Sequence, residues 1–384
     1  MKPENLDKII RLRHELHRHP DLSLHEEGTM AILRAFLEEN TSLEIAEREG
    51  WFYAVRYGDP DRAPIAFRAD MDALPIDESG DAEFSRVSEN PGVSHKCGHD
   101  GHMAALCGLA LELDAAEPGT AKMNEKLPRT VYMIFQPAEE IGRGAEHCAG
   151  MIREKGISEI YAFHNLGGYP EGALVFRRGL TQPASEGLTI RFHGKTCHAG
   201  APEEGINPAE ALARTALRAQ ELNAADSCAE PDRWCTITGM KCGDADFGIS
   251  PGEASLAVTL RAAGEAVMKE MEEDLVRYAG RLAEESGLRT DREISDYFPE
   301  TRNHDEALER VLRAARELKI LMIGMKEMWR ASEDFGHYLK ECPGAIFYIG
   351  NGKDWPALHT AQYDFNDRIL GTAVDLFSRL ALGE

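Results

Sequence analysis

Short apolar runs rich in β-branched residues alternate with helical patterns along most of this 384-residue chain. The strand-like runs are residues 63–69, 130–135, 159–163 and 345–349. The amphipathic helical patterns are residues 6–18, 27–39, 100–113, 144–152 and 305–318. Strands that alternate with helices usually form a sheet covered by helices. The order therefore predicts an α/β fold, with a mixed, mostly parallel sheet and helices on both faces.

The pattern changes between residues 185 and 298. Residues 186–193 alternate apolar and polar side chains, as a half-exposed antiparallel strand does. The elements expected next are a helix at 207–222, strands at 234–240 and 254–261, a helix at 265–285 and a strand at 290–297. This βαββαβ order predicts a four-stranded antiparallel sheet with two helices. We expect a discontinuous domain, 1–184 and 299–384, and an inserted α+β domain, 185–298.

Charge and hydropathy exclude several classes of protein. The formal net charge is −23, which argues against a nucleic-acid partner and against an anionic membrane surface. No window approaches the roughly 18 uncharged apolar residues that span a bilayer, and the N-terminus has no apolar signal region. The 8 cysteines lack framework spacing, so reduced thiols are expected. These features predict a cytoplasmic protein.

Residues with metal-binding side chains gather at 97–102, which read Cys-Gly-His-Asp-Gly-His. A thiolate and imidazoles this close in sequence can face one point only from a loop, which the glycines permit. The segment also opens the predicted helix at Asp100, which could cap it. Taken alone, the pattern also fits a structural loop in which a cysteine lies beside a capping aspartate.

Further polar residues follow the predicted strands. They are Asp70 and Asp72 after 63–69, Glu139 and Glu140 after 130–135, His164 after 159–163 and His359 after 345–349. Because sites in open α/β sheets lie beyond the carboxyl ends of the strands, we expect these side chains to lie near Cys97.

Ligands of these types suit zinc, cobalt or nickel, and manganese less well. Two ions about 3.5–4 Å apart would need roughly this many ligands. The adjacent residues Glu139 and Glu140 point in different directions if the segment is extended, so one can bind metal while the other acts as general base. A water bound to such ions can ionise near neutral pH, which makes amide hydrolysis accessible without a covalent intermediate.

Five segments together resemble a known family. They read Arg-His-Glu-Leu-His at 13–17, Phe-Arg-Ala-Asp-Met-Asp-Ala-Leu-Pro at 67–75, Cys-Gly-His-Asp-Gly-His at 97–102, Gln-Pro-Ala-Glu-Glu at 136–140 and Ser-Glu-Asp-Phe at 332–335. The chain resembles, over nearly its whole length, the metallopeptidase family of the aminoacylases and glutamate carboxypeptidases. It looks most like the amidohydrolase branch with hippurate hydrolase and the plant hydrolases of indole-acetyl-amino-acid conjugates.

The resemblance implies a catalytic domain, 1–184 and 299–384, interrupted by a lid or dimerisation domain, 185–298. It implies two divalent metal ions per chain (Zn, Mn, Co or Ni), with Glu139 as general base. The implied ligands are Cys97, His99, Glu140, His164 and His359. In the inserted domain, residues 194–202 match the family's loop, in which His198 would stabilise the oxyanion. In dimeric members this histidine reaches the other subunit's site.

The chain departs from the wider family in two places. Where other members begin the site with His-x-Asp, this chain has Asp70-Met71-Asp72, and Cys97 enters as a ligand instead, which marks the amidohydrolase branch. Many relatives also have Phe-Asn-Val-Ile-Pro in the lid, but this chain reads Phe-Gly-Ile-Ser-Pro at 247–251, so Gly248 replaces an asparagine that helps to hold substrate.

Three residues are expected to support the site. Asp72 would either orient a metal ligand by a hydrogen bond or form a structural turn. Asp100 is also expected to support a ligand in this way. Arg261 matches the usual lid arginine and could clamp a substrate carboxylate, or form a surface ion pair.

Together these features predict a metal-dependent amidohydrolase that cleaves the amide bond of N-acyl-amino acids or similar small conjugates. The alternatives are a dipeptidase or carboxypeptidase, and a deacetylase of a small biosynthetic intermediate. A non-catalytic protein that binds acyl-amino acids is a further alternative, although it predicts a damaged ligand set, and every implied ligand is present. We also expect a homodimer through the inserted domain.

Overall fold

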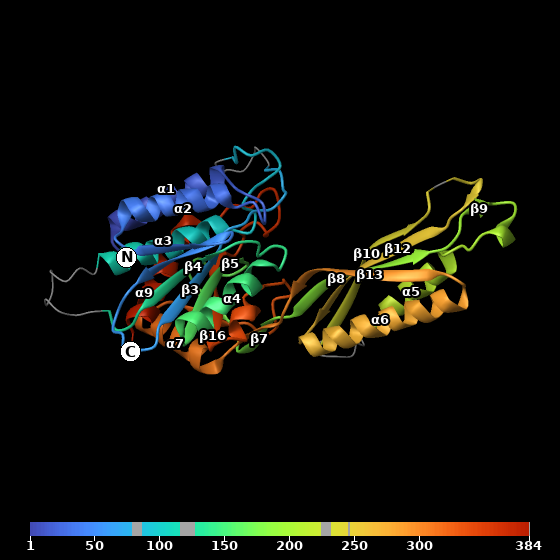
Figure 1. Ribbon diagram of the computed structural model, residues 1–384. Helices are drawn as coiled ribbons and strands as arrows, with labels where there is room; N and C mark the ends of the chain where they lie inside the picture. The colour runs from blue at the N-terminus through green and yellow to red at the C-terminus, as the bar shows by residue number, and fades with distance from the viewer. Residues whose placement is uncertain (79–86, 116–126, 224–231, 245, 384) are drawn as a thin grey trace. The chain divides into compact units, whose positions relative to one another are not determined.

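The computed structural model describes residues 1–78, 87–115, 127–223, 232–244 and 246–383 (Figure 1). The chain forms two compact units. Unit 1 comprises Met1–Thr181, Thr301–Met328 and Asp334–Glu384, and unit 2 comprises Gln182–Glu300 and Trp329–Glu333. The limits predicted from the sequence are 184/185 and 298/299, with residues 329–333 in the first domain.

Unit 1 is built on an eight-stranded mixed sheet in the order β1-β2-β4-β3-β5-β16-β6-β15. Its strands are β1 (Glu44–Arg48), β2 (Trp51–Arg56), β3 (Ile65–Asp70), β4 (Val131–Gln136), β5 (Glu159–Gly167), β6 (Leu174–Phe176), β15 (Met322–Gly324) and β16 (Gly344–Gly352). The central strands β4, β3, β5 and β16 are parallel, whereas β1, β2 and the β16–β6 pair add antiparallel contacts. The predicted mixed sheet is confirmed.

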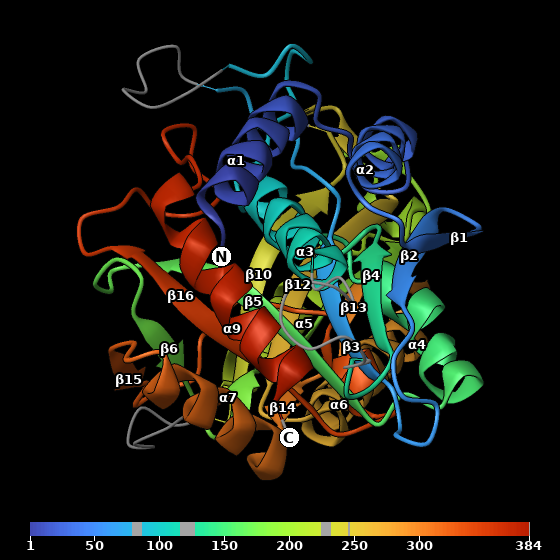
Figure 2. The same ribbon diagram turned by 90° about the vertical axis from the view of Figure 1, so that its left-hand side faces the viewer.

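Helices α1 (Pro3–Arg18), α3 (His99–Asp114) and α9 (Leu370–Leu382) pack against one another over one face of this sheet (Figure 2). The middle helix, α3, is buried along almost its whole length, because it lies between the sheet and the other two helices. Gly108 allows the close approach of α9, since a Cβ there would lie 2.6 Å from Val374 Cγ2. The remaining helices of unit 1 are α2 (Glu27–Asn40), α4 (Gly144–Lys155), α7 (Asp305–Glu317) and α8 (Gly336–Leu339).

The carboxyl ends of the parallel strands meet at one edge of the sheet. Asp70 is the last residue of β3 and pairs with Gln136, the last residue of β4. Further along the same sheet, His164 of β5 pairs with Tyr348 of β16. Residues that follow these strands are therefore delivered to a common region of unit 1.

Unit 2 contains a four-stranded antiparallel sheet in the order β10-β12-β8-β13. The strands are β8 (Ala184–His193), β10 (Arg233–Cys242), β12 (Glu253–Ala262) and β13 (Arg289–Phe298), and the helices are α5 (Ala209–Glu221) and α6 (Glu265–Glu285). Both helices pack on the sheet and on each other (Figure 1). Alternate residues of β8, such as Leu188, Ile190 and Phe192, are buried beneath them. The predicted βαββαβ unit is confirmed.

The described residues contain no helix that combines the length and the apolarity needed to cross a bilayer.

An acidic side chain is buried in unit 2. Glu186 of β8 is 4% exposed, and its Oε1 has no hydrogen-bond partner among the described residues. Burial and the like charge of Glu272 raise the pKa of Glu186 to about 7. The folded protein therefore binds this proton more tightly than the unfolded chain does. As a result, the free energy of unfolding decreases as the pH rises from near 4.5 to about 7, and the loss persists above that range.

We expect Glu186→Gln to raise Tm at pH 8 and to change it much less at pH 5, because the amide removes the ionisation. The measurement is calorimetric Tm at both pH values. Glu273→Gln, at an exposed position of α6, is the matched control and should change Tm little at either pH. An equal gain at pH 5 and pH 8 would show that ionisation of Glu186 is not the cause.

Candidate metal centre

The loop that carries the cysteine and histidines ends in a left-handed turn. Gly98 has φ +95°, and a Cβ at this position would lie 2.5 Å from Asn165 Oδ1. This turn starts α3 at His99, one residue earlier than the sequence predicts. The prediction that Asp100 caps the helix is therefore wrong. The Asp100 carboxylate instead accepts a hydrogen bond from Gly101 N (2.9 Å) and lies 2.8 Å from His17 Nδ1.

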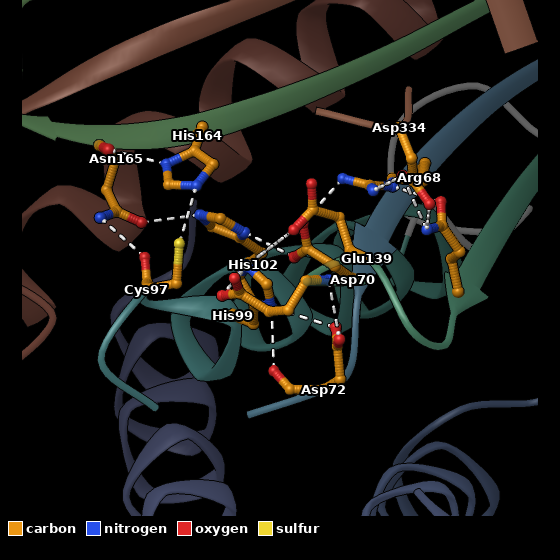
Figure 3. Close-up of polar contacts among 12 residues, drawn as sticks. Arg68, Asp70, Asp72, Cys97, His99, His102, Glu139, His164, Asn165 and Asp334 are labelled. Atoms are coloured by element: carbon orange, nitrogen blue, oxygen red, sulfur yellow. Dashed lines mark hydrogen bonds and ion pairs between the residues drawn. The ribbon is translucent and has the colours of Figure 1, made fainter. Parts of the chain in front are cut away.

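The five ligands that the sequence predicts come together in unit 1. Cys97, His99 and His164 form one group whose ligand atoms all lie within 4.8 Å of one another, and Cys97 Sγ is 3.4 Å from His164 Nε2 (Figure 3). A second group consists of Cys97, Glu140 and His359, and a third of His99, Glu139 and Glu140. Since the groups share members, they describe one continuous cluster.

The two imidazoles at the centre of the cluster present the same nitrogen to it. His99 Nδ1 lies 2.9 Å from the backbone oxygen of Asp72, and His164 Nδ1 lies 2.8 Å from that of Asn165. A carbonyl oxygen only accepts, so we assign the proton of each ring to Nδ1. Nε2 of each ring then faces the cluster and would offer its lone pair to a bound cation, as a metal ligand requires.

Two of these ligand atoms are buried without a hydrogen-bond partner among the described residues. They are His99 Nε2 and Glu140 Oε1, and they lie 3.7 Å apart. Orphaned buried polar atoms are costly and rare, and a cation between this pair would satisfy both. The donor set, with a thiol, imidazoles and carboxylates, is also one that binds divalent transition metals. The residues therefore fit a metal centre.

Burial shifts the pKa values of the cluster. It raises the pKa of the Cys97 thiol, an effect that the Glu140 carboxylate increases, and it raises the pKa of Glu140 to about 7. It lowers the pKa of His164, which leaves that ring neutral. For His99 the burial effect is outweighed by the carboxylates of Asp70 and Asp72, and the pKa rises to about 10. A divalent cation would compensate these crowded negative charges and favour the thiolate.

A backbone hydrogen bond positions His359 beside the cluster. Its amide donates to the carbonyl oxygen of Lys96 (2.8 Å), the residue before Cys97, and its φ is +61°. Nε2 of His359 lies 3.6 Å from Glu140 Oε2, and its side chain is 52% exposed. His359 thus forms the solvent-facing side of the cluster, while His99 and His164 form its buried side.

Asp72 contacts two members of the cluster from behind. Its Oδ2 accepts hydrogen bonds from the backbone N of Glu140 (2.9 Å) and from Ser23 Oγ (2.7 Å). Its Oδ1 lies 3.4 Å from His99 Nδ1. The side chain therefore ties the strand end that bears Asp72 to both His99 and Glu140, which is the geometry of a ligand-orienting residue.

Two further residues, His102 and Asn165, lie behind the ligands, and of these only Asn165 was not expected from the sequence. His102 Nδ1 lies 2.6 Å from Asp70 Oδ1, and its Nε2 lies 2.7 Å from Asn165 Oδ1 (Figure 3). Asn165 also donates to the carbonyl oxygen of Cys97 (3.2 Å). The only local signal for Asn165 is its place directly after His164 on β5.

A buried arginine fixes the ends of β3 and β4. The guanidinium of Arg68 donates to Asp70 (2.7 Å), Gln136 (2.7 Å) and Asp334 (2.8 Å) (Figure 3). Asp334 also accepts from the backbone N of Ala145 (2.9 Å), at the start of α4. Charge-assisted hydrogen bonds of this kind are strong, so they hold the strand ends that carry the cluster.

A glutamate from the segment before α2 supports the turn that bears the two adjacent glutamates. Glu26 Oε1 accepts from the backbone N of Ala138 (2.8 Å), whose φ is +51°. This bond holds the left-handed residue just before Glu139 and Glu140. No role for Glu26 was predicted from the sequence.

The other predicted site residues belong to unit 2. His198 lies in β9 (Cys197–His198), is exposed, and accepts a hydrogen bond at Nδ1 from Gly200 N (2.9 Å). Gly248, at the position of the missing asparagine, accepts at its carbonyl oxygen from Ala199 N (2.9 Å). Arg261 of β12 donates to Ser332 Oγ (3.3 Å), and its Nε has no hydrogen-bond partner in the described part of the chain. No carboxylate of a described residue lies within 4.0 Å of Arg261, so the surface ion pair is not formed there.

Comparison with known proteins agrees with this geometry. Residues 66–383 match the family model described as Peptidase family M20/M25/M40. The chain is 29% identical over 381 residues to N-acetylcysteine deacetylase of Bacillus subtilis (strain 168), covering 98% of this chain and 96% of that protein. It is 28% identical to hippurate hydrolase of Campylobacter jejuni, covering 99% and 98% of the two chains.

A solved structure shows the same fold. It is the YXEP protein of Bacillus subtilis, described as a dinuclear metal-binding peptidase of the M20 family, with a TM-score of 0.80 and 26% identity. The alignment covers 100% of this chain and 98% of that one. The fold and the site thus define a hydrolase of amide bonds. The chain belongs to Peptidase family M20/M25/M40, which confirms the family resemblance.

Proposed function

We propose that this protein is a two-metal amidohydrolase that cleaves the amide bond of N-acyl-amino acids or similar small conjugates. The observation that carries the proposal is the pair of orphaned ligand atoms, His99 Nε2 and Glu140 Oε1, 3.7 Å apart and beside Glu139. The names of two relatives, N-acetylcysteine deacetylase and hippurate hydrolase, denote N-acylated amino acids as substrates.

The ligands proposed for the two ions are Cys97, His99, Glu140, His164 and His359, with Asp72 and Asp100 as supporting residues. When bound, divalent ions such as zinc, manganese, cobalt or nickel would polarise the scissile carbonyl and make a bound water more acidic. Asp72 orients His99 and Glu140 through the contacts described above. Asp100 is buried next to His99 and contacts His17, so it fixes the start of α3.

Glu139 acts as the general base in this proposal. Its Oε2 lies 3.9 Å from His99 Nε2, within the group that His99 and Glu140 form with it, so the carboxylate is close enough to act on a water held there. It accepts a proton from the attacking water. It then donates that proton to the amide nitrogen as the C–N bond breaks, which releases the carboxylic acid and the free amine.

Unit 2 supplies the remaining roles. His198 stabilises the oxyanion of the tetrahedral intermediate, and Arg261 binds the carboxylate of the amino-acid part with two hydrogen bonds. Burial lowers the pKa of Arg261, and the unpartnered Nε leaves hydrogen-bonding capacity for an anion. Unit 2 of the same chain or of a second copy in a homodimer could provide His198. The molar mass in solution, measured by light scattering, tests the dimer.

The test of the proposal is the release of free amine from N-acetyl, N-benzoyl and N-indoleacetyl amino acids, with dipeptides measured in parallel. Hydrolysis of the N-acyl compounds, lost on chelation, is the expected result. Hydrolysis of dipeptides alone would favour a dipeptidase or carboxypeptidase; a relative of Saccharolobus solfataricus is named thermostable carboxypeptidase 2. Hydrolysis restricted to acetylated biosynthetic intermediates would favour the deacetylase alternative. Binding without turnover would favour the non-catalytic protein.

A further inference from the structure

Four arginines surround a hollow of about 350 Å³ in unit 1, in a protein whose net charge is −23. The arginines are Arg129, which lies just before β4, Arg310 and Arg313 of α7, and Arg379 of α9. The hollow is also lined by Ala314 and Glu317, by Leu380 and Leu382 of α9, and by Gly383. This local positive charge is opposite in sign to the net charge of the chain, so we asked what balances it.

Nearby carboxylates neutralise only part of this positive charge. Glu159 lies 3.1 Å from Arg310 and 3.8 Å from Arg129, and Glu317 pairs with Arg379. The guanidinium of Arg313 has no carboxylate of a described residue within 4.0 Å. Among the residues that the structure describes, four guanidinium groups therefore face two carboxylates.

Arg129 provides the second, independent observation. Its side chain is only 7% exposed, and its Nε has no hydrogen-bond partner among the described residues. A buried guanidinium donor without an acceptor is costly, since its hydration has been lost and not replaced. An anion in the hollow that Arg129 lines would add a negative charge beside this guanidinium, whose nearest carboxylate, Glu159, is 3.8 Å away.

The hollow lies far from the metal cluster. Arg129 and Glu159 are at the amino ends of β4 and β5, whereas the cluster lies at the carboxyl ends of the same parallel strands. Six residues of β4 span about 20 Å at roughly 3.3 Å per residue. A ligand in the hollow would therefore not touch a substrate at the cluster.

We propose that this hollow, which we call the four-arginine pocket, is a binding site for a small dianion, carrying either a phosphate group or two carboxylates. Guanidinium groups bind both kinds of anion through paired, charge-assisted hydrogen bonds. The excess of two positive charges among the described residues around the hollow matches a dianion, and the volume leaves room for a small organic group attached to it. This site is separate from the proposed catalytic function and does not depend on it.

The experiment measures the binding of inorganic phosphate and of succinate to the metal-loaded protein by isothermal titration calorimetry, at constant ionic strength. We expect one of the two to bind, and Arg313→Gln to weaken that binding by about tenfold or more, the effect of one charged hydrogen bond. Arg313 is chosen because it has no ion pair whose loss would disturb the fold. The anion that binds identifies the chemical class of the ligand.

Arg316→Gln is the matched control, because it removes the same charge from the same helix but does not line the pocket. It should leave the affinity unchanged. Binding that is equally strong in the wild-type protein and in Arg313→Gln would place the anion elsewhere, such as on the metal ions, and would overturn the proposal. Absence of binding by both anions at millimolar concentration would overturn it as well.

Discussion

Replacing Glu139 with glutamine is expected to lower kcat by about 10²–10⁴-fold while metal content stays near the wild-type value. The amide has almost the same shape as the carboxylate, so the cluster keeps its packing, but it cannot accept the proton of the attacking water. Both glutamate side chains lie within 4.0 Å of His99 Nε2. We assign the ligand role to Glu140 because it carries the orphaned Oε1 and lies 3.6 Å from His359 Nε2, which leaves Glu139 as the proposed base. Steady-state kinetics and elemental analysis of the same sample provide the measurement.

Glu140→Gln is the matched control for that experiment. This neighbouring change should reduce metal content and activity together, because it weakens a ligand and not the base. If Glu139→Gln loses its metal while Glu140→Gln keeps it, the two glutamates have exchanged roles and the assignment is wrong.

Replacing Cys97 with serine is expected to lower metal affinity and activity together. Cys97 belongs both to the group with His99 and His164 and to the group with Glu140 and His359, so it joins the two halves of the cluster. A serine hydroxyl is a poorer ligand for zinc-like ions than a thiolate. Substitution of a residue that hydrogen-bonds a metal ligand typically lowers metal affinity by about 10–100-fold. Loss of the ligand itself should therefore lower metal affinity by more than about 100-fold. Competition with a chromogenic chelator measures it.

Cys107→Ser is the matched control, since Cys107 is a fully buried cysteine of the same helix region with only apolar surroundings to disturb. It should lower Tm without changing metal affinity. Full metal content and full activity in Cys97→Ser would remove Cys97 from the ligand set.

Much of the fold could be predicted from local patterns. The strict alternation of β8 and the long amphipathic α6 were enough to define the βαββαβ order of unit 2. β1 could not be recognised, because it is an edge strand whose side chains are mostly exposed and therefore lack a two-residue period. No prediction covered α9, although its apolar residues recur at helical spacing.

The candidate site could be predicted as a set of residue types but not as a geometry. Placement after parallel strands was enough to bring together Cys97, Glu140, His164 and His359, since topology delivers strand ends to one edge. The partners of Arg68 could not be predicted from the sequence, because Asp334 lies 266 residues away in the chain and no local pattern indicates the contact.

The start of α3 was also misjudged. Only the three-dimensional contact of Gly98 with Asn165 shows why the turn is left-handed. The tautomers of His99 and His164 likewise depend on backbone oxygens that the sequence does not place.

The central claim is that this cluster holds metal ions that are required for amide hydrolysis. The most direct test is the metal content of freshly purified protein, followed by chelation and by readdition of zinc, cobalt, nickel or manganese, with free amine released from N-acyl-amino acids as the readout. We predict about two ions per chain, activity lost on chelation and activity restored on readdition. Protein that contains no metal and takes up none on incubation would contradict the account.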